Sequence, residues 1–144
     1  MNLQVIDTFR LFLDFGLLIL IWMVQLIAYP SFSYFKVENL YKWHTAYTKR
    51  IAIIVIPLMF GQLITVGLQV FMQQNFYTVA SGILVLLVWC STFLQFVPLH
   101  ANISMKKNVK ESVEKLKSKN WLRTILWTLL FLLTLYFYFI AELF

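Results

Sequence analysis

Apolar residues are concentrated in four long runs that shorter polar stretches separate. The runs cover about residues 11–29, 51–71, 77–99 and 121–140. A helix rises about 1.5 Å per residue, so each run is long enough to cross a hydrocarbon core of about 30 Å. The pattern therefore predicts an all-α integral membrane protein. We expect an antiparallel four-helix transmembrane bundle that forms a single domain over residues 1–144.

Polar residues recur at helical spacing inside the first run. Asp7, Arg10 and Asp14 share one helix face, and Gln25 returns to that face after about three turns. A carboxylate that faces lipid is costly, so this face is expected to point into the bundle. We expect the intramembrane charge of Asp14 to pair with Arg10 near the membrane interface.

The second run carries a polar stripe at spacings of three and four residues. Its members are Gln62, Thr65, Gln69 and Gln73. Such a stripe usually joins helices through hydrogen bonds. An alternative reading combines the stripe with Asp14, Tyr138 and Glu142 into an ion or proton path.

Two polar connectors separate the first run from the second and the third from the fourth. Residues 31–50 are basic and aromatic without a glycine, and residues 105–120 are charged with Val109, Val113 and Leu116 at helical spacing. We expect residues 31–50 to be mostly helical and to lie along the headgroups, and residues 105–120 to form an amphipathic connector. Pro30 should end the first span, because the residue before a proline is driven out of helical geometry.

Composition and charge support a membrane protein and orient it. Hydrophobic residues make up 61% of the chain, against about 45 to 50% in soluble domains. Of the 12 Lys and Arg residues, all but Arg10 lie in the connectors or at the start of the fourth run: Lys36, Lys42, Lys49, Arg50, Lys106, Lys107, Lys110, Lys115, Lys117, Lys119 and Arg123. The positive-inside rule places both connectors in the cytoplasm and both termini outside it, in a bacterial inner (plasma) membrane. The same placement beside apolar runs argues against nucleic-acid binding despite the net charge of +6.

No enzyme motif is present in the sequence. It contains no serine-hydrolase elbow, zinc-protease helix, P-loop or glycine-rich dinucleotide turn, so the sequence leaves open whether the protein is an enzyme. Cys90 is the only cysteine, which excludes an internal disulfide and a cysteine-based metal site. We expect Cys90 to be a small core residue.

Reactive side chains gather where the basic ends of the four spans should converge. The candidate ligand-binding residues are Gln25, Tyr29, His44, Tyr47, Arg50, Gln95, His100, Arg123 and Trp127, with a rim of Trp43, Trp121 and Trp127. Histidine can ligate haem iron or exchange protons with a quinone, and arginine can hold a carboxylate, phosphate or propionate group. The alternative is that the histidines and arginines only anchor helix ends to lipid phosphate.

Several short motifs resemble a known family. Gln25-x-x-x-Tyr29-Pro30-x-Phe32, His44-x-x-Tyr47-x-x-Arg50-Ile51, Pro57-Leu58-Met59 and Asn120-Trp121-x-Arg123-Thr124-x-x-Trp127 look like a family of small uncharacterised bacterial four-span inner-membrane proteins. The layout is more distantly similar to anthrone-oxygenase-like proteins and four-span protoporphyrinogen oxidases. That similarity implies redox work on a planar aromatic substrate.

Two functions follow from these observations. The first is binding of a lipid-soluble or aromatic ligand, such as a quinone or porphyrin, at the cytoplasmic end of the bundle, with a redox role. The second is a non-catalytic accessory or assembly subunit of a larger membrane complex. The expected partners are the lipid bilayer and either further copies of the chain or a larger complex.

Overall fold

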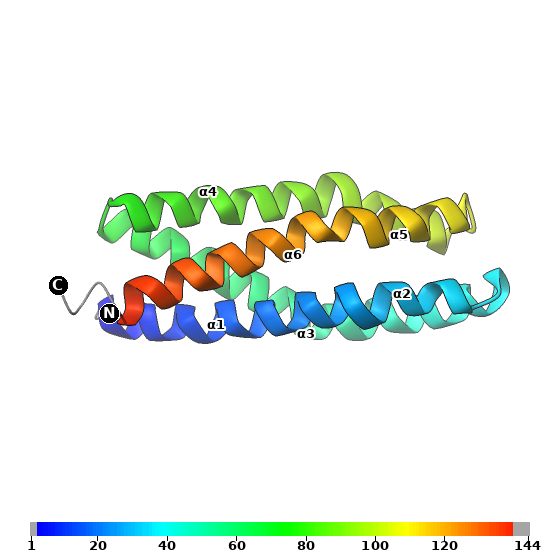
Figure 1. Ribbon diagram of the computed structural model, residues 1–144, viewed down its shortest axis with the longest axis horizontal. Coiled ribbons are helices and arrows are strands. Elements are labelled where there is room, and N and C mark those ends of the chain that lie inside the picture. Colours follow the sequence, from blue (N-terminus) through cyan, green and yellow to red (C-terminus); the bar gives the residue numbers. More distant parts are fainter. Residues whose placement is uncertain (1–2, 140–144) are drawn as a thin grey trace.

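The protein is a bundle of four long antiparallel helices in the computed structural model, which describes residues 3–139 (Figure 1). The described residues contain no strand, and all four helices are long and apolar enough to cross a membrane. This confirms the predicted all-α bundle. In chain order the elements are α1 (Leu3–Met23), η1 (Val24–Ala28), α2 (Tyr29–Ser31), η2 (Phe32–Tyr34), α3 (Val37–Met72), α4 (Phe76–Ser91), η3 (Thr92–Phe96), α5 (Val97–Ser104) and α6 (Val109–Phe139).

Both connectors are helical, but they continue the spans instead of lying across them. Residues 37–50 form the first turns of α3, and residues 109–120 form the first turns of α6. The 36 residues of α3 measure about 54 Å, well beyond the hydrocarbon thickness. The expectation that residues 31–50 lie along the headgroups is therefore wrong, because residues 37–50 continue the axis of α3. The bundle has a long basic end, which we define as residues 29–50 and 100–123.

Pro30 does not end the first span, because a wider helical turn precedes it. Proline lacks an N–H group and its ring clashes with the carbonyl four residues earlier. In η1 the Tyr29 N–H bonds to the Val24 carbonyl, five residues back, and the chain stays helical through Pro30. The third span also has a π-helical turn before its proline, Pro98, where the Val97 N–H bonds to the Thr92 carbonyl. Such π-helical turns are frequent at functional sites.

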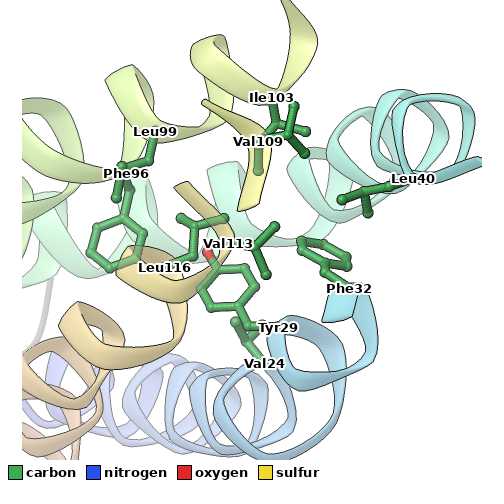
Figure 2. Close-up of a cluster of buried hydrophobic side chains, with 10 residues drawn as sticks. All are labelled: Val24, Tyr29, Phe32, Leu40, Phe96, Leu99, Ile103, Val109, Val113 and Leu116. Carbon is green, nitrogen blue, oxygen red and sulfur yellow. The ribbon is translucent and has the colours of Figure 1, made fainter. Parts of the chain in front are cut away.

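Two apolar cores occupy the bundle. One cluster, which includes Leu17, Met59, Val88 and Leu130, fills the middle of the bundle. The other lies at the basic end, where side chains from all four spans meet (Figure 2). Its members are Val24, Tyr29, Phe32, Leu40, Phe96, Leu99, Ile103, Val109, Val113 and Leu116.

The exposed side chains change character between the two cores. The outer face of α6 carries Lys110, Glu114 and Lys119 and then, from Leu122 onward, leucine and isoleucine. On α3 the exposed residues change from Arg50 to Ile53. These positions mark where the helices enter lipid. The exterior of the basic end thus carries many charged residues, together with exposed aromatic side chains such as Tyr34 and Trp43.

Arg10 and Asp14 form an ion pair in the bundle interior. The Arg10 Nε to Asp14 Oδ2 distance is 3.3 Å, and both side chains are 0% exposed. The predicted pair is confirmed, and both side chains are fully buried between the helices. Arg10 also donates to Gln69 Oε1 at 2.6 Å and to Ser81 Oγ at 2.5 Å. All three guanidinium nitrogens therefore have partners.

The Asp14 carboxylate is equally well bonded. Its oxygens accept hydrogen bonds from Gln62 Nε2 at 2.5 Å and from Thr134 Oγ1 at 2.6 Å. Gln69 donates in turn to Asp7. This network joins α1, α3, α4 and α6, so Gln62 and Gln69 of the predicted stripe hold helices together, whereas Thr65 bonds to the backbone of its own helix and Gln73 is exposed. The contacts favour a structural role over an ion path. Of the residues assigned to that path, Glu142 lies outside the described residues.

Cys90 is an exposed residue of α4, which overturns the prediction that it fills the core. Its neighbours Val88 and Ser91 are buried, so Cys90 lies on the lipid-facing side of the helix. A single small residue in an apolar run carries no signal about which way it faces, and the packing partners of α4 decide this.

Replacing Asp14 with Asn should destabilise the protein strongly, because Arg10 is left as a buried cation without a countercharge. Breaking a buried ion pair from one side costs about 3 to 5 kcal/mol. Asp7→Asn is the matched control. Asp7 is half-buried, so this substitution should lower the free energy of unfolding by only about 1 kcal/mol. Denaturant titration of helicity in detergent micelles measures both values. The double change Arg10→Gln with Asp14→Asn should recover part of the loss, and no recovery would contradict the pairing.

Candidate functional site

A cavity of about 310 Å³ lies between the four spans, at the level where the bundle enters lipid. Five predicted site residues line it together: Tyr29, Tyr47, His100, Arg123 and Trp127. The remaining wall is mostly aliphatic, with Phe96 and two threonines. The predicted convergence of reactive groups into one pocket is therefore correct for these five.

The other four candidates do not line the cavity. His44 is fully buried behind His100, and Gln25 joins α6 instead, by accepting from Asn120 Nδ2 at 3.0 Å. Arg50 is exposed on the outside of α3, and Gln95 is half-buried away from the cavity. Each of these four residues is close to the cavity along its helix, but its side chain points away from the cavity. Depth follows from the sequence, whereas helix rotation depends on the partners.

The predicted aromatic rim is also largely wrong. Trp43 stacks on Phe35, and Trp121 packs edge-on against Trp22. Both pairs lie on the outside of the bundle, since Trp43 and Trp121 are exposed. Trp127 alone of the three reaches the cavity.

A chain of three polar groups extends from the cavity wall into the basic-end core. The Tyr29 hydroxyl lies 3.2 Å from His100 Nε2, and His100 Nδ1 lies 2.8 Å from His44 Nε2. The two imidazole rings stack with centroids 5.1 Å apart. Neutral histidine carries one N–H, so one proton lies between the two rings and its position sets the direction of the whole chain. The chain suits proton exchange with a ligand.

Haem ligation does not fit these histidines. Both ring nitrogens of His100 have partners, and the unpaired His44 Nδ1 is buried outside the cavity wall. Iron ligation by His100 would require its bond to Tyr29 or its bond to His44 to break. Within residues 3–139 no cluster of three or more His, Cys, Asp or Glu side chains could hold a metal ion.

Arg123 is the charged group of the cavity. It is 7% exposed, and its guanidinium carbon lies 4.2 Å from the Phe96 ring centroid and 5.1 Å from that of Trp127. Its Nε has no hydrogen-bond partner. It interacts electrostatically with the Tyr29 and Tyr47 hydroxyls and with the His100 ring, and it shares a side-chain hydrogen bond with Tyr29. Among the described residues no acidic side chain forms an ion pair with Arg123.

Trp127 couples the cavity to the Arg10–Asp14 network. Its ring forms part of the cavity wall, while its Nε1 donates to Gln62 Oε1 at 3.1 Å. Gln62 in turn donates to Asp14. The wall against which Arg123 stacks is thus held in place by the buried charge pair.

Asn120 is a buried polar residue outside the cavity wall that the sequence analysis did not single out, although it fixes Gln25. It is 0% exposed and holds Gln25. The sequence contains a pattern that indicates its burial. Buried residues of α6 repeat at alternating spacings of four and three: Val109, Val113, Leu116, Asn120, Arg123, Trp127, Leu130 and Thr134. This is the seam of a heptad pattern. Following the pattern from the charged connector into the apolar run places Asn120 and Arg123 on one buried face.

No protein-family model matches the chain, and comparisons with curated proteins and with solved structures find no match either. The resemblance to small four-span inner-membrane proteins, and the distant similarity to anthrone-oxygenase-like and protoporphyrinogen oxidase proteins, therefore stay predictions.

Proposed function

We propose that the protein binds a lipid-soluble or aromatic ligand in the cavity at its basic end. The observation that carries this proposal is Arg123, a buried cation whose Nε is unpaired on the wall of an otherwise mostly apolar cavity. A few convergent polar groups in an apolar pocket are typical of small-molecule sites. Nothing about headgroup anchoring requires Arg123 to be buried.

The size of the cavity bears on the kind of ligand. A volume of about 310 Å³ lies near the lower limit of small-molecule pockets, which span about 300 to 1,000 Å³. A single or fused ring of quinone size suits it better than a porphyrin. For a redox role, Tyr29 and His100 are the residues placed to exchange protons with such a ring.

We also propose that the basic end faces the cytoplasm of a bacterial cell, with the protein in its inner membrane. The support is the charge asymmetry, since exposed lysines surround the basic end and Arg10, at the other end, is buried and paired. The cavity would then open at the cytoplasmic side of the bilayer. Further copies of the chain or a larger membrane complex are the proposed protein partners.

Arg123→Gln should remove a bound ligand from the purified protein. Arg50→Gln is the matched control, because Arg50 belongs to the same end of the bundle but is exposed and outside the cavity. Organic extracts of gently solubilised wild type should contain an apolar or aromatic molecule in a fixed ratio to protein. Mass spectrometry should find it depleted about tenfold in Arg123→Gln and unchanged in Arg50→Gln.

His44→Ala tests the same site through the groups behind it. Loss of His44 frees His100 Nδ1 and should lower occupancy less than Arg123→Gln does. Wild type without ligand, or equal ligand in all variants, would contradict the proposal. Co-purification of a larger membrane complex without ligand would favour the accessory-subunit role.

Cysteine labelling tests the orientation. Lys110→Cys and Gln74→Cys place a thiol at opposite ends of the bundle in a Cys90→Ala background, and both sites are exposed. Gln74 is preferable to Asn75, whose side chain caps α4. In intact cells an impermeant thiol reagent should label position 74 and leave position 110 unlabelled until the membrane is opened. The reverse pattern would invert the proposed topology.

A further inference from the structure

The two buried arginines of the bundle differ in their partners. Arg10 has Asp14, Gln69 and Ser81, one for each nitrogen. Arg123 lies over the Phe96 and Trp127 rings and interacts with the Tyr29 hydroxyl, its Nε has no partner, and no carboxylate pairs with it among the described residues. Burying a cation without a countercharge is costly. The same chain supplies an acid to one arginine and leaves the other open toward a cavity, which points to a countercharge from outside the chain.

The cavity is polar at one end and apolar at the other. Along α3 the lining changes from Tyr47 and Thr48 to Val55 and Met59 as the helix runs from the basic end toward the middle of the bundle. On the first span the lining changes in the same direction, from Tyr29 to Leu20. This gradient has the orientation of a membrane amphiphile, with its polar head toward the bilayer surface and its apolar body toward the centre.

The cavity is more closed on one side than on the other. The lining residues Ile21, Val24 and Trp127, from α1, η1 and α6, are buried. The lining residues Ile51 and Ala52 of α3 are half-buried, and Val97 of α5 is 50% exposed. Val97 directly follows the π-helical turn η3 and precedes Pro98. A ligand can therefore reach the cavity sideways from lipid, between α3 and α5.

We infer that the ligand is a singly charged amphiphilic acid that enters from the bilayer leaflet at the basic end and places its ionised oxygen head on Arg123. This inference rests on the proposed function and narrows its ligand class. One guanidinium matches one negative charge, and a carboxylate accepts its parallel N–H groups in a bidentate manner. The Tyr29 and Tyr47 hydroxyls lie beside the same guanidinium and can donate to the head.

Other membrane anions fit less well. A diacyl phospholipid also carries a charged phosphate, but its two chains and glycerol exceed a cavity of about 310 Å³. A neutral quinone would leave Arg123 without a countercharge. A single-chain carboxylic acid satisfies both the charge and the volume, with the end of its tail continuing into lipid through the open side.

A photoreactive long-chain fatty acid and its methyl ester test the inference without any mutation. Both probes carry a diazirine on the chain and differ only in the charge of the head. In wild-type protein in neutral lipid nanodiscs, the acid should label cavity residues such as Val55 and Met59, as mapped by peptide mass spectrometry. The ester should label these positions about tenfold less, while both label the lipid-facing Ile53 equally.

Variants of Arg123 complete the test. Arg123→Gln should abolish the preference for the acid, Arg123→Lys should keep part of it, and Arg50→Gln should leave it unchanged. Helicity and gel-filtration behaviour show whether each variant is folded. Equal cavity labelling by acid and ester would overturn the inference but leave ligand binding standing. Cavity labelling by neither probe, with no molecule extractable from wild type, would overturn both.

Discussion

A charge inside a membrane protein must find its partner within the protein or in a bound molecule. The bundle meets this constraint in two ways. Near the termini, Arg10 and Asp14 neutralise each other, and side chains from α3, α4 and α6 satisfy their remaining hydrogen bonds. Toward the basic end, Arg123 lies over the Phe96 and Trp127 rings and lines a cavity. The first arrangement holds the helices together, and the second is suited to binding.

The cavity lies at the point where the bundle changes its surroundings. Beyond Lys119 the outer face of α6 is apolar, and before it the outer face carries charged residues. The core at the basic end carries Tyr29 and packs around the buried His44, while the middle core carries Trp127. Each core therefore supplies one wall of the cavity. Through Gln62 the buried ion pair positions Trp127, so the charge network and the site are mechanically linked.

The sequence predicted the features that depend on one helix at a time. Run length gave the four spans, and spacing correctly placed Asp14 on the face of Arg10. Features that depend on helix rotation were missed: Cys90 faces outward, and Arg50 and Gln95 face away from the cavity. The end of the first span was also misplaced, because η1 accommodates Pro30 by one widened turn. The heptad seam of α6 was readable, but only when the charged connector and the apolar run are treated as one helix.

We propose that a molecule from outside the chain neutralises Arg123 within the bundle. The most direct measurement is an experimental density map of the protein extracted with its native lipid, without detergent exchange. We expect non-protein density in the cavity, in contact with the Arg123 guanidinium and extending between α3 and α5. A cavity holding only water, with Arg123 turned outward to the headgroups, would contradict this proposal.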